Sequence, residues 1–87
     1  MWESGNLTLG GIYYEWEAKV YDKPSHYGIY SGRISKLYII EKDPYLMGAN
    51  KDVAVYDRGW VLKPKTDEHK TVYQHVLSII EGRHTKN

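Results

Sequence analysis

The fold is decided by the stretch Ile12-Tyr13-Tyr14-Glu15-Trp16-Glu17-Ala18-Lys19-Val20-Tyr21. Its side chains alternate with the two-residue period of a β-strand, so that one face is apolar and the other is largely polar. The apolar face carries Ile12, Tyr14, Trp16, Ala18 and Val20, and the opposite face carries Tyr13, Glu15, Glu17, Lys19 and Tyr21. The stretch therefore predicts a strand in a sheet that is covered on one side only.

The segment before this strand predicts the other half of a β-hairpin. Residues 7–9 (Leu-Thr-Leu) alternate in the same way, and Gly10-Gly11 separates them from the strand. Glycine accepts the positive φ that a tight two-residue turn requires. On the other side, Pro24 ends the pairing because its nitrogen has no hydrogen to donate to a neighbouring strand.

Two more strands are predicted in the middle of the chain, at residues 34–41 and 52–56. A connection with several turn-forming residues joins them over 43–50. Gly59 ends the second of these strands, and we expect residues 60–62 to continue in extended form as far as Pro64.

A single helix is predicted after Thr66, whose hydroxyl is suited to cap its first turn. Asp67 and Glu68 follow in that turn, where negative charge is favourable to the helix dipole. Gly82 is well placed as the left-handed residue after the last turn, and residues 84–87 are expected to fray. The apolar stripe of the helix consists of Val72, Tyr73, Val76, Leu77, Ile79 and Ile80.

These elements predict an α+β domain in which a four-stranded antiparallel β-sheet (order β-β-β-β-α) has one C-terminal helix packed on one face. The 87 residues are the length of one domain, which we place at residues 1–83, with a tail at 84–87. Both edges of such a sheet are exposed. A homodimer formed through an edge, or through the tyrosine-bearing open face, is therefore a second expectation.

The net charge of +1 argues against two classes of protein. A DNA mimic should be strongly acidic, and a general nucleic-acid binder should be clearly basic. The charge is uneven, however, with −3 over residues 1–22, +4 over residues 23–65 and 0 over residues 66–87. The middle of the chain therefore has the composition to present a local basic face.

The chain has no cysteine, which excludes disulfides and thiolate metal sites. No run approaches the ~20 apolar residues of a membrane span, and no signal peptide opens the sequence. We expect a soluble protein of the cytoplasm that does not bind membranes.

No catalytic or metal-binding constellation is evident. The four histidines are His26, His69, His75 and His84, and they lack the spacing of metal ligands. A Gly-x-Ser-x-Gly nucleophile elbow is absent. Glu15 and Glu17 point the same way, but a flat solvent-facing sheet offers no pocket for acid–base chemistry. We therefore expect no enzymatic activity, no catalytic residue, no metal and no cofactor.

The loop before the strand at 34–41 contains Gly28, Gly32 and Arg33. Three interpretations stay open for it. The glycines can shape a long connection, they can let the backbone and the Arg33 fork approach an anion or nucleotide, or the loop can form a protein interface. A phosphate-binding loop normally leads into a helix, and the lysine of a Walker loop is missing.

The segment 56–60 (Tyr-Asp-Arg-Gly-Trp) repeats this combination of aromatic, glycine and arginine residues, and we expect Trp60 to lie in the core. The chain has nine Tyr, three Trp and no Phe, a composition that favours half-buried positions and interfaces. Together the two segments predict an aromatic and basic partner-binding patch of the kind that stacks bases and pairs phosphates. Its members are Tyr27, Tyr30, Arg33, Lys36 and Arg58.

The motifs Tyr27-Gly28-Ile29 and Gly32-Arg33-Ile34-Ser35-Lys36-Leu37, followed by Tyr56-Asp57-Arg58-Gly59-Trp60, resemble a family of small uncharacterised phage and prophage proteins of Gram-positive bacteria. The resemblance spans residues 12–82, and the connection at 43–50 is longer than in other members. It implies a phage accessory protein in the bacterial cytoplasm. Proteins of that setting often bind and block a host factor, CRISPR and other defence components included.

Two functions are expected from these observations. The first is a small non-enzymatic interaction protein that binds a host protein, as an inhibitor of bacterial defence of the anti-CRISPR kind. The alternative is a nucleic-acid or nucleotide-binding module that uses the loop from Gly28 to Arg33 with the nearby aromatic and basic residues.

Overall fold

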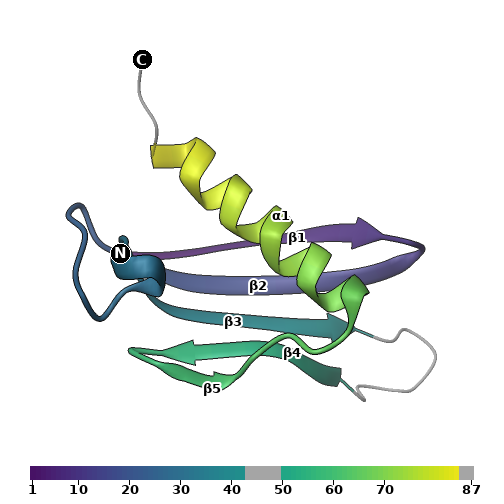
Figure 1. Ribbon diagram of the computed structural model, residues 1–87. Helices are drawn as coiled ribbons and strands as arrows, with labels where there is room; N and C mark the ends of the chain where they lie inside the picture. The colour runs from purple at the N-terminus through teal and green to yellow at the C-terminus, as the bar shows by residue number, and fades with distance from the viewer. Residues whose placement is uncertain (43–49, 85–87) are drawn as a thin grey trace.

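The computed structural model describes residues 1–42 and 50–84. Its elements are β1 (Trp2–Leu9), β2 (Ile12–Val20), the single 3-10 turn η1 (Ile29–Ser31), β3 (Ile34–Lys42), β4 (Asn50–Asp57), β5 (Trp60–Leu62) and α1 (Asp67–His84). The strands form one antiparallel sheet in sequence order, and α1 lies diagonally across one face of it (Figure 1). The expected α+β class, with an antiparallel sheet and one C-terminal helix, is confirmed.

The expected number of four strands is wrong, because the sheet has five. We expected residues 60–62 to be extended, which is confirmed, but we did not count them as a strand: the chain turns back after β4, and they pair with it as β5. The reversal occurs at Arg58, which has a left-handed φ of 59°, and the Asp57 amide donates to the Gly59 carbonyl at 2.9 Å. A non-glycine residue in this conformation is uncommon, so the turn was not predictable from the identity of residue 58.

The N-terminal strand is longer than the pattern of residues 7–9 predicted, since β1 begins at Trp2. It pairs along its whole length with β2, from Trp2 opposite Lys19 to Leu9 opposite Ile12. The predicted hairpin turn is confirmed: Gly10 and Gly11 have φ values of 60° and 79°. The predicted strand at residues 12–21 is confirmed as β2, which ends one residue earlier, at Val20.

The core lies between α1 and the sheet face that the alternation of β2 predicted to be apolar. Trp16 is 3 % exposed and Val76 of the helix is fully buried. The other buried hydrophobic side chains are Tyr14, Ala18, Val20, Ile29, Ile34, Leu37, Ile39, Val53, Ala54, Tyr56, Val72, Tyr73 and Ile80. Trp60 packs against this cluster as a half-buried residue.

The helix begins as predicted, with the Thr66 hydroxyl accepting a hydrogen bond from the His69 amide at 3.0 Å. The prediction that Gly82 ends it in a left-handed conformation is wrong, because α1 continues to His84. We expected His84 to begin a frayed tail, but it lies in the last helical turn and contacts Glu3 of β1. The contact with Glu3 therefore stabilises the last turn of the helix, which the local sequence alone would leave to fray. The rest of the expected tail, residues 85–87, lies outside the described residues.

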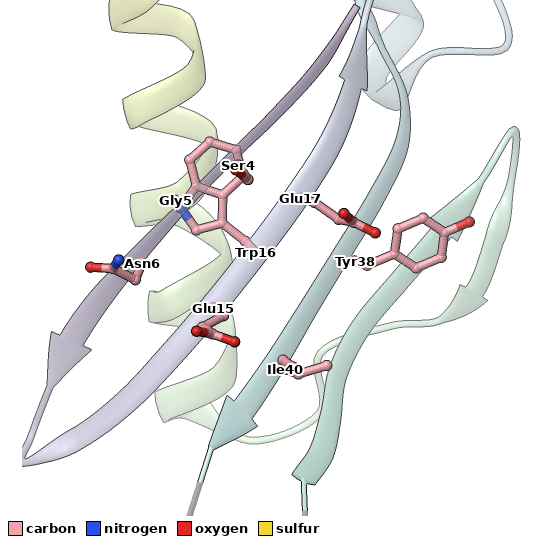
Figure 2. Close-up of a pocket in the computed structure, with 8 residues that line it drawn as sticks. All are labelled: Ser4, Gly5, Asn6, Glu15, Trp16, Glu17, Tyr38 and Ile40. Atoms are coloured by element: carbon pink, nitrogen blue, oxygen red, sulfur yellow. The ribbon is translucent and has the colours of Figure 1, made fainter.

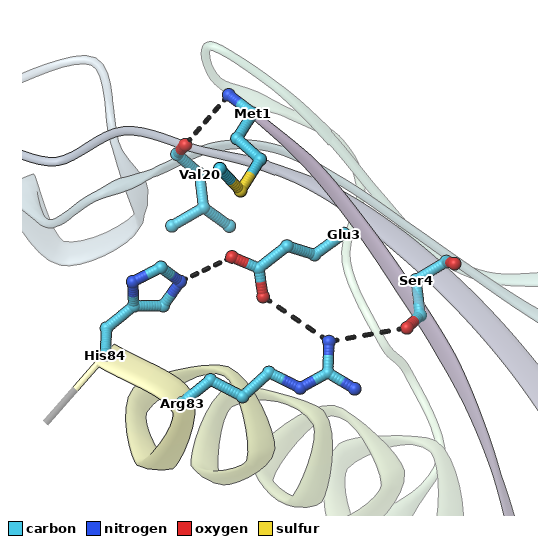
Figure 3. A network of polar contacts seen from close by, with 6 residues as sticks. All are labelled: Met1, Glu3, Ser4, Val20, Arg83 and His84. Atoms are coloured by element: carbon cyan, nitrogen blue, oxygen red, sulfur yellow. Dashed lines mark hydrogen bonds and ion pairs between the residues drawn. The ribbon is translucent and has the colours of Figure 1, made fainter.

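A polar contact with a carboxylate joins each end of α1 to the sheet. At the N-terminal end, His69 Nε2 lies 3.0 Å from the Glu41 carboxylate. At the C-terminal end, both Arg83 and His84 reach Glu3, with an Arg83 Nη1 to Glu3 Oε1 distance of 3.4 Å (Figure 3). Arg83 also lies over the Trp16 ring at 5.1 Å. These contacts fix the helix on one face and leave the other face of the sheet uncovered by it.

Over residues 1–42 and 50–84, no helix has the length and apolar character needed to cross a membrane. The predicted connection at 43–50 lies outside the described residues except for Asn50, the first residue of β4.

Candidate functional site

The sheet face opposite α1, here called the open face, is the first candidate. Strand register fixes its members, because directly opposite residues share a face. One cross-strand row contains Ser4, Glu17, Tyr38 and Val55, and a neighbouring row contains Trp2, Lys19, Lys36 and Asp57. Large aromatic side chains are exposed here, with Trp2 51 % and Tyr13 36 % exposed. Trp2 stacks on Tyr38 with a centroid separation of 6.4 Å.

A shallow pocket of about 440 Å³ opens on this face (Figure 2). It is lined by Ser4, Gly5, Asn6, Glu15, Trp16, Glu17, Tyr38 and Ile40. The expectation that this face offers no pocket at the two glutamates is therefore wrong. The side chains that β1 contributes on this face, Ser4 and Asn6, are shorter than the Glu, Tyr and Ile side chains contributed by β2 and β3, so that space is left beside them.

The two glutamates of the pocket differ in their partners. The Glu15 carboxylate pairs with Lys42 at 3.3 Å and accepts a hydrogen bond from the Tyr13 hydroxyl at 3.4 Å. Among the described residues, Glu17 has neither an ion pair nor a side-chain hydrogen bond. Glu17 therefore presents an unneutralised carboxylate at the solvent side of the pocket.

The second candidate is the aromatic and basic patch predicted from the sequence, and the structure brings part of it together. The Arg58 guanidinium lies 5.4 Å from the centre of the Tyr27 ring, a cation–π contact. The Tyr27 carbonyl accepts a hydrogen bond from the Tyr56 hydroxyl at 2.7 Å, which anchors the loop 21–33 to β4. The His26 ring packs against the Tyr27 ring, with 4.3 Å between the two ring centres.

Lys36 joins this end of the sheet through β3. It lies directly opposite Lys19, and like charges in that position repel each other, while Asp57 at 3.6 Å compensates one of them. Tyr21 is close to the same charges, and its pKa is lowered, chiefly by a hydrogen bond with Lys19; burial opposes this shift, and the Lys19 charge, Ser35 and the Arg58 charge add to it. Sequence reasoning missed Lys19 because only the register shows that it lies opposite Lys36, and it missed Tyr21 because only the folded chain brings it close to Lys19 and Arg58.

Within the described part of the chain, no hydrogen bond, ion pair or ring contact joins the remaining two predicted residues, Tyr30 and Arg33, to Tyr27 or Arg58. Tyr30, in η1, is 81 % exposed, and its hydroxyl lies near that of Tyr73 on the helix-covered side. Arg33 is half-buried, and its carbonyl accepts a hydrogen bond from the Tyr21 amide at 3.0 Å. None of the five predicted residues lines the pocket of the open face.

The two glycines of the loop have a steric reason within the fold. A Cβ atom on Gly28 would lie 2.1 Å from the Gly32 carbonyl oxygen, and one on Gly32 would lie 2.9 Å from the Ile29 oxygen. The backbone segments pack directly against each other at these positions. This geometry favours the first of the three interpretations, in which the glycines shape the connection.

Sequence reasoning missed the pocket because its β1 wall was not predicted as a strand. The alternation of residues 12–21 placed Glu17 on the open face, but only the pairing of β1 brings Ser4 and Trp2 beside it.

Comparison with known proteins identifies a family: the model of a domain of unknown function, DUF7678, matches residues 1–81. No curated protein and no solved structure matches the chain.

Proposed function

Since the chain belongs to the DUF7678 family, a domain of unknown function, we propose its role from its own surface. The protein is a small non-enzymatic interaction module that binds a protein partner through the open face. The observation that carries this proposal is the set of aromatic side chains, Trp2, Tyr13 and Tyr38, on a sheet face that the helix leaves uncovered. Tyrosine and tryptophan are the residues most enriched at the energetic centres of interfaces.

The size of the open face supports a protein as the ligand. Strands lie about 4.8 Å apart and rise about 3.3 Å per residue, so the four long strands present roughly 500 Å² before side-chain relief is counted. A standard interface takes about 800 Å² from each partner. A protein partner would therefore cover the whole open face and reach its rim.

The proposed partner is a host protein in the bacterial cytoplasm. The motifs at residues 27–37 and 56–60 support this setting, because they resemble small phage and prophage proteins of Gram-positive bacteria. An accessory protein in that setting acts by occupying a surface of its target, which requires no catalytic group. A component of CRISPR or of another defence system is the class of target that this setting favours.

The test is affinity capture from a Gram-positive host lysate with wild-type protein and two lysine variants. Tyr38→Lys places a charge in the centre of the open face, and Gln74→Lys places the same charge on the exposed side of α1. We expect a host protein to be retained by wild type and by Gln74→Lys and to be lost with Tyr38→Lys. Recovery of no specific protein, or equal recovery with Tyr38→Lys of the same melting temperature, would contradict the proposal.

A second candidate function, nucleic-acid or nucleotide binding, is favoured by the cations at one end of the sheet. Lys19 opposite Lys36, with Arg58 over Tyr27, combines positive charge with aromatic rings. Counterion release would make such binding fall steeply between about 50 and 200 mM salt. Titrations of RNA, DNA and nucleotides that show no salt-dependent binding would remove this candidate.

Self-association is a third possibility, distinct from binding a host protein and from binding a nucleic acid or nucleotide. Analytical ultracentrifugation of the purified protein measures whether it forms a dimer. The edge strand β1 contains neither proline nor lysine, the residues that commonly protect an edge. A dimer that persists in Tyr38→Lys would place the contact at the β1 edge, and a dimer lost in that variant would place it on the open face.

A further inference from the structure

Among the described residues, Glu17 is the charged residue of the pocket that has no ion pair. It lies directly opposite Ser4 on one side and Tyr38 on the other, and its carboxylate is directed toward the Tyr38 ring (Figure 2). Within the described residues it has no cation, whereas Glu15 beside it is paired with Lys42. The pocket thus combines a free negative charge with an aromatic ring.

This combination fits a cation with a flat shape. A guanidinium group forms two parallel hydrogen bonds with a carboxylate and stacks on an aromatic face, while an ammonium group is a compact, strongly hydrated charge. The stacking of Trp2 on Tyr38 widens the aromatic surface beside Glu17. An anionic ligand is disfavoured, because Glu15 and Glu17 both line the pocket.

We propose that the pocket of the open face binds an arginine side chain of the protein partner, with Glu17 pairing with the guanidinium and Tyr38 packing against its plane. The inference rests on the proposed function, since it names the chemistry that the partner presents at the centre of the open face. Arginine is among the residues that most often dominate an interface energetically, which fits a pocket at this position.

The probe is N-acetyl-arginine amide, titrated into ¹⁵N-labelled full-length protein and followed by amide chemical shifts. N-acetyl-citrulline amide, which has the same shape without the charge, and N-acetyl-lysine amide are titrated in parallel. We expect saturable shifts at the amides of Ser4, Glu17 and Tyr38 with the arginine probe. Citrulline should bind at least about tenfold more weakly, because it lacks the charge-assisted hydrogen bonds.

Two variants, one that removes the charge of Glu17 and one that removes the ring of Tyr38, make the assignment specific. Glu17→Gln should raise the dissociation constant of the arginine probe at least about tenfold, and Tyr38→Leu should weaken it as well. The matched control is Asp22→Asn, which removes an exposed carboxylate outside the pocket and should leave binding unchanged. The Glu17 side chain is exposed, so Glu17→Gln should keep the wild-type melting temperature.

The arginine site is overturned if the arginine and citrulline probes shift the same amides equally, if no saturable shift occurs, or if Glu17→Gln binds as wild type does. A lysine probe that binds as tightly as arginine would overturn the stacking role of Tyr38. Failure of the probe together with Tyr38-dependent capture of a host protein would leave the open-face function standing without this site. Binding of the probe with no captured partner would count against the function alone.

Discussion

Position 5 of the chain has room for a hydrogen atom and nothing larger. A Cβ atom on Gly5 would lie 2.8 Å from Cζ2 of the Trp16 ring, which is buried beneath the helix. The indole has filled the space that any side chain on β1 would need. Gly5 thus decides how Trp16 packs, and nothing in the sequence marks it as different from a loop glycine.

We predict that Gly5→Ala lowers the free energy of unfolding by about 1–3 kcal/mol, because overpacking forces the Trp16 ring or β1 to move. The matched control is Gly82→Ala: a Cβ atom there meets nothing within 4 Å, and alanine is favoured in a helix by about 0.5–1 kcal/mol. Chemical denaturation of both variants measures the two effects. Equal stability of the two proteins would show that the Trp16 ring does not occupy this space.

Tyr14 gives the protein a pH-dependent stability. Burial, followed by the charges of Glu41 and Glu68, raises its pKa above 10, and its buried hydroxyl has no hydrogen-bond partner among the described residues. Burial also raises the pKa of Tyr73, with a further contribution from Tyr30. Because both folded-state pKa values exceed the unfolded value of 10, this contribution is complete below pH 10 and is lost as the pH rises further.

Tyr14→Phe should therefore raise the free energy of unfolding at pH 8 by about 1 kcal/mol, since it removes an unpaired buried hydroxyl without changing the ring. It should also make the melting temperature fall less between pH 9 and pH 11 than it does in wild type. Thermal melts across this range test both statements. A variant that is less stable than wild type at pH 8 would mean that the hydroxyl has a partner.

At the scale of single residues, sequence reasoning succeeded where local geometry decides. Gly10 and Gly11 were predicted in the hairpin turn and Thr66 at the helix cap, and each role depends only on neighbouring backbone atoms. It failed at Gly82, because the contacts of Arg83 and His84 with Glu3 extend the helix past it. Such a contact joins residues about 80 positions apart, and no local pattern contains it.

At the scale of elements, the helix is held on the sheet by a carboxylate near each of its ends. Glu41 meets His69 near the first turn, and Glu3 meets Arg83 and His84 in the last turn. The Glu3 side chain is only 10 % exposed, so its pairs are shielded from water more than a surface ion pair is. These contacts set the diagonal placement of α1 across the sheet, from Glu41 on β3 to Glu3 on β1 (Figure 1).

Glu3→Gln should lower the free energy of unfolding by about 1–2 kcal/mol, between the values for exposed and buried ion pairs. Hydrogen exchange should increase first in the last turn of α1, while Val76 and its neighbours stay protected. The control is Glu17→Gln, an exposed glutamate of the open face, which should change stability by less than about 0.5 kcal/mol. Equal effects of the two substitutions would show that the Glu3 contacts do not hold the helix.

The elements themselves were predictable wherever a repeating pattern ran for several residues. Alternation identified β2, and the apolar stripe identified α1. The three-residue strand β5 was missed because the chain reverses before it at Arg58, which has a left-handed φ. No local sequence pattern predicts that conformation for an arginine. The early part of β1 was missed because Glu3, Ser4, Gly5 and Asn6 show no apolar alternation, and its strand form follows from pairing with β2.

At the scale of the whole molecule, one face of the sheet carries the buried core beneath α1, and the helix leaves the other face uncovered. The alternation of residues 12–21 was enough to predict which side chains belong to which face. It could not predict which residues from separate strands meet, because that requires the register. The encounter of Glu17 with Tyr38, and of Lys19 with Lys36, is therefore information that only the folded sheet contains.

The central claim, that the open face is the binding surface, is tested most directly by hydroxyl-radical footprinting of the protein alone and in its captured complex. Trp2, Tyr13 and Tyr38 report on the open face, and His75 reports on the exposed side of the helix. The account predicts that oxidation of the three aromatic residues falls in the complex while that of His75 is unchanged. Protection of His75 with the open face still fully reactive would contradict it.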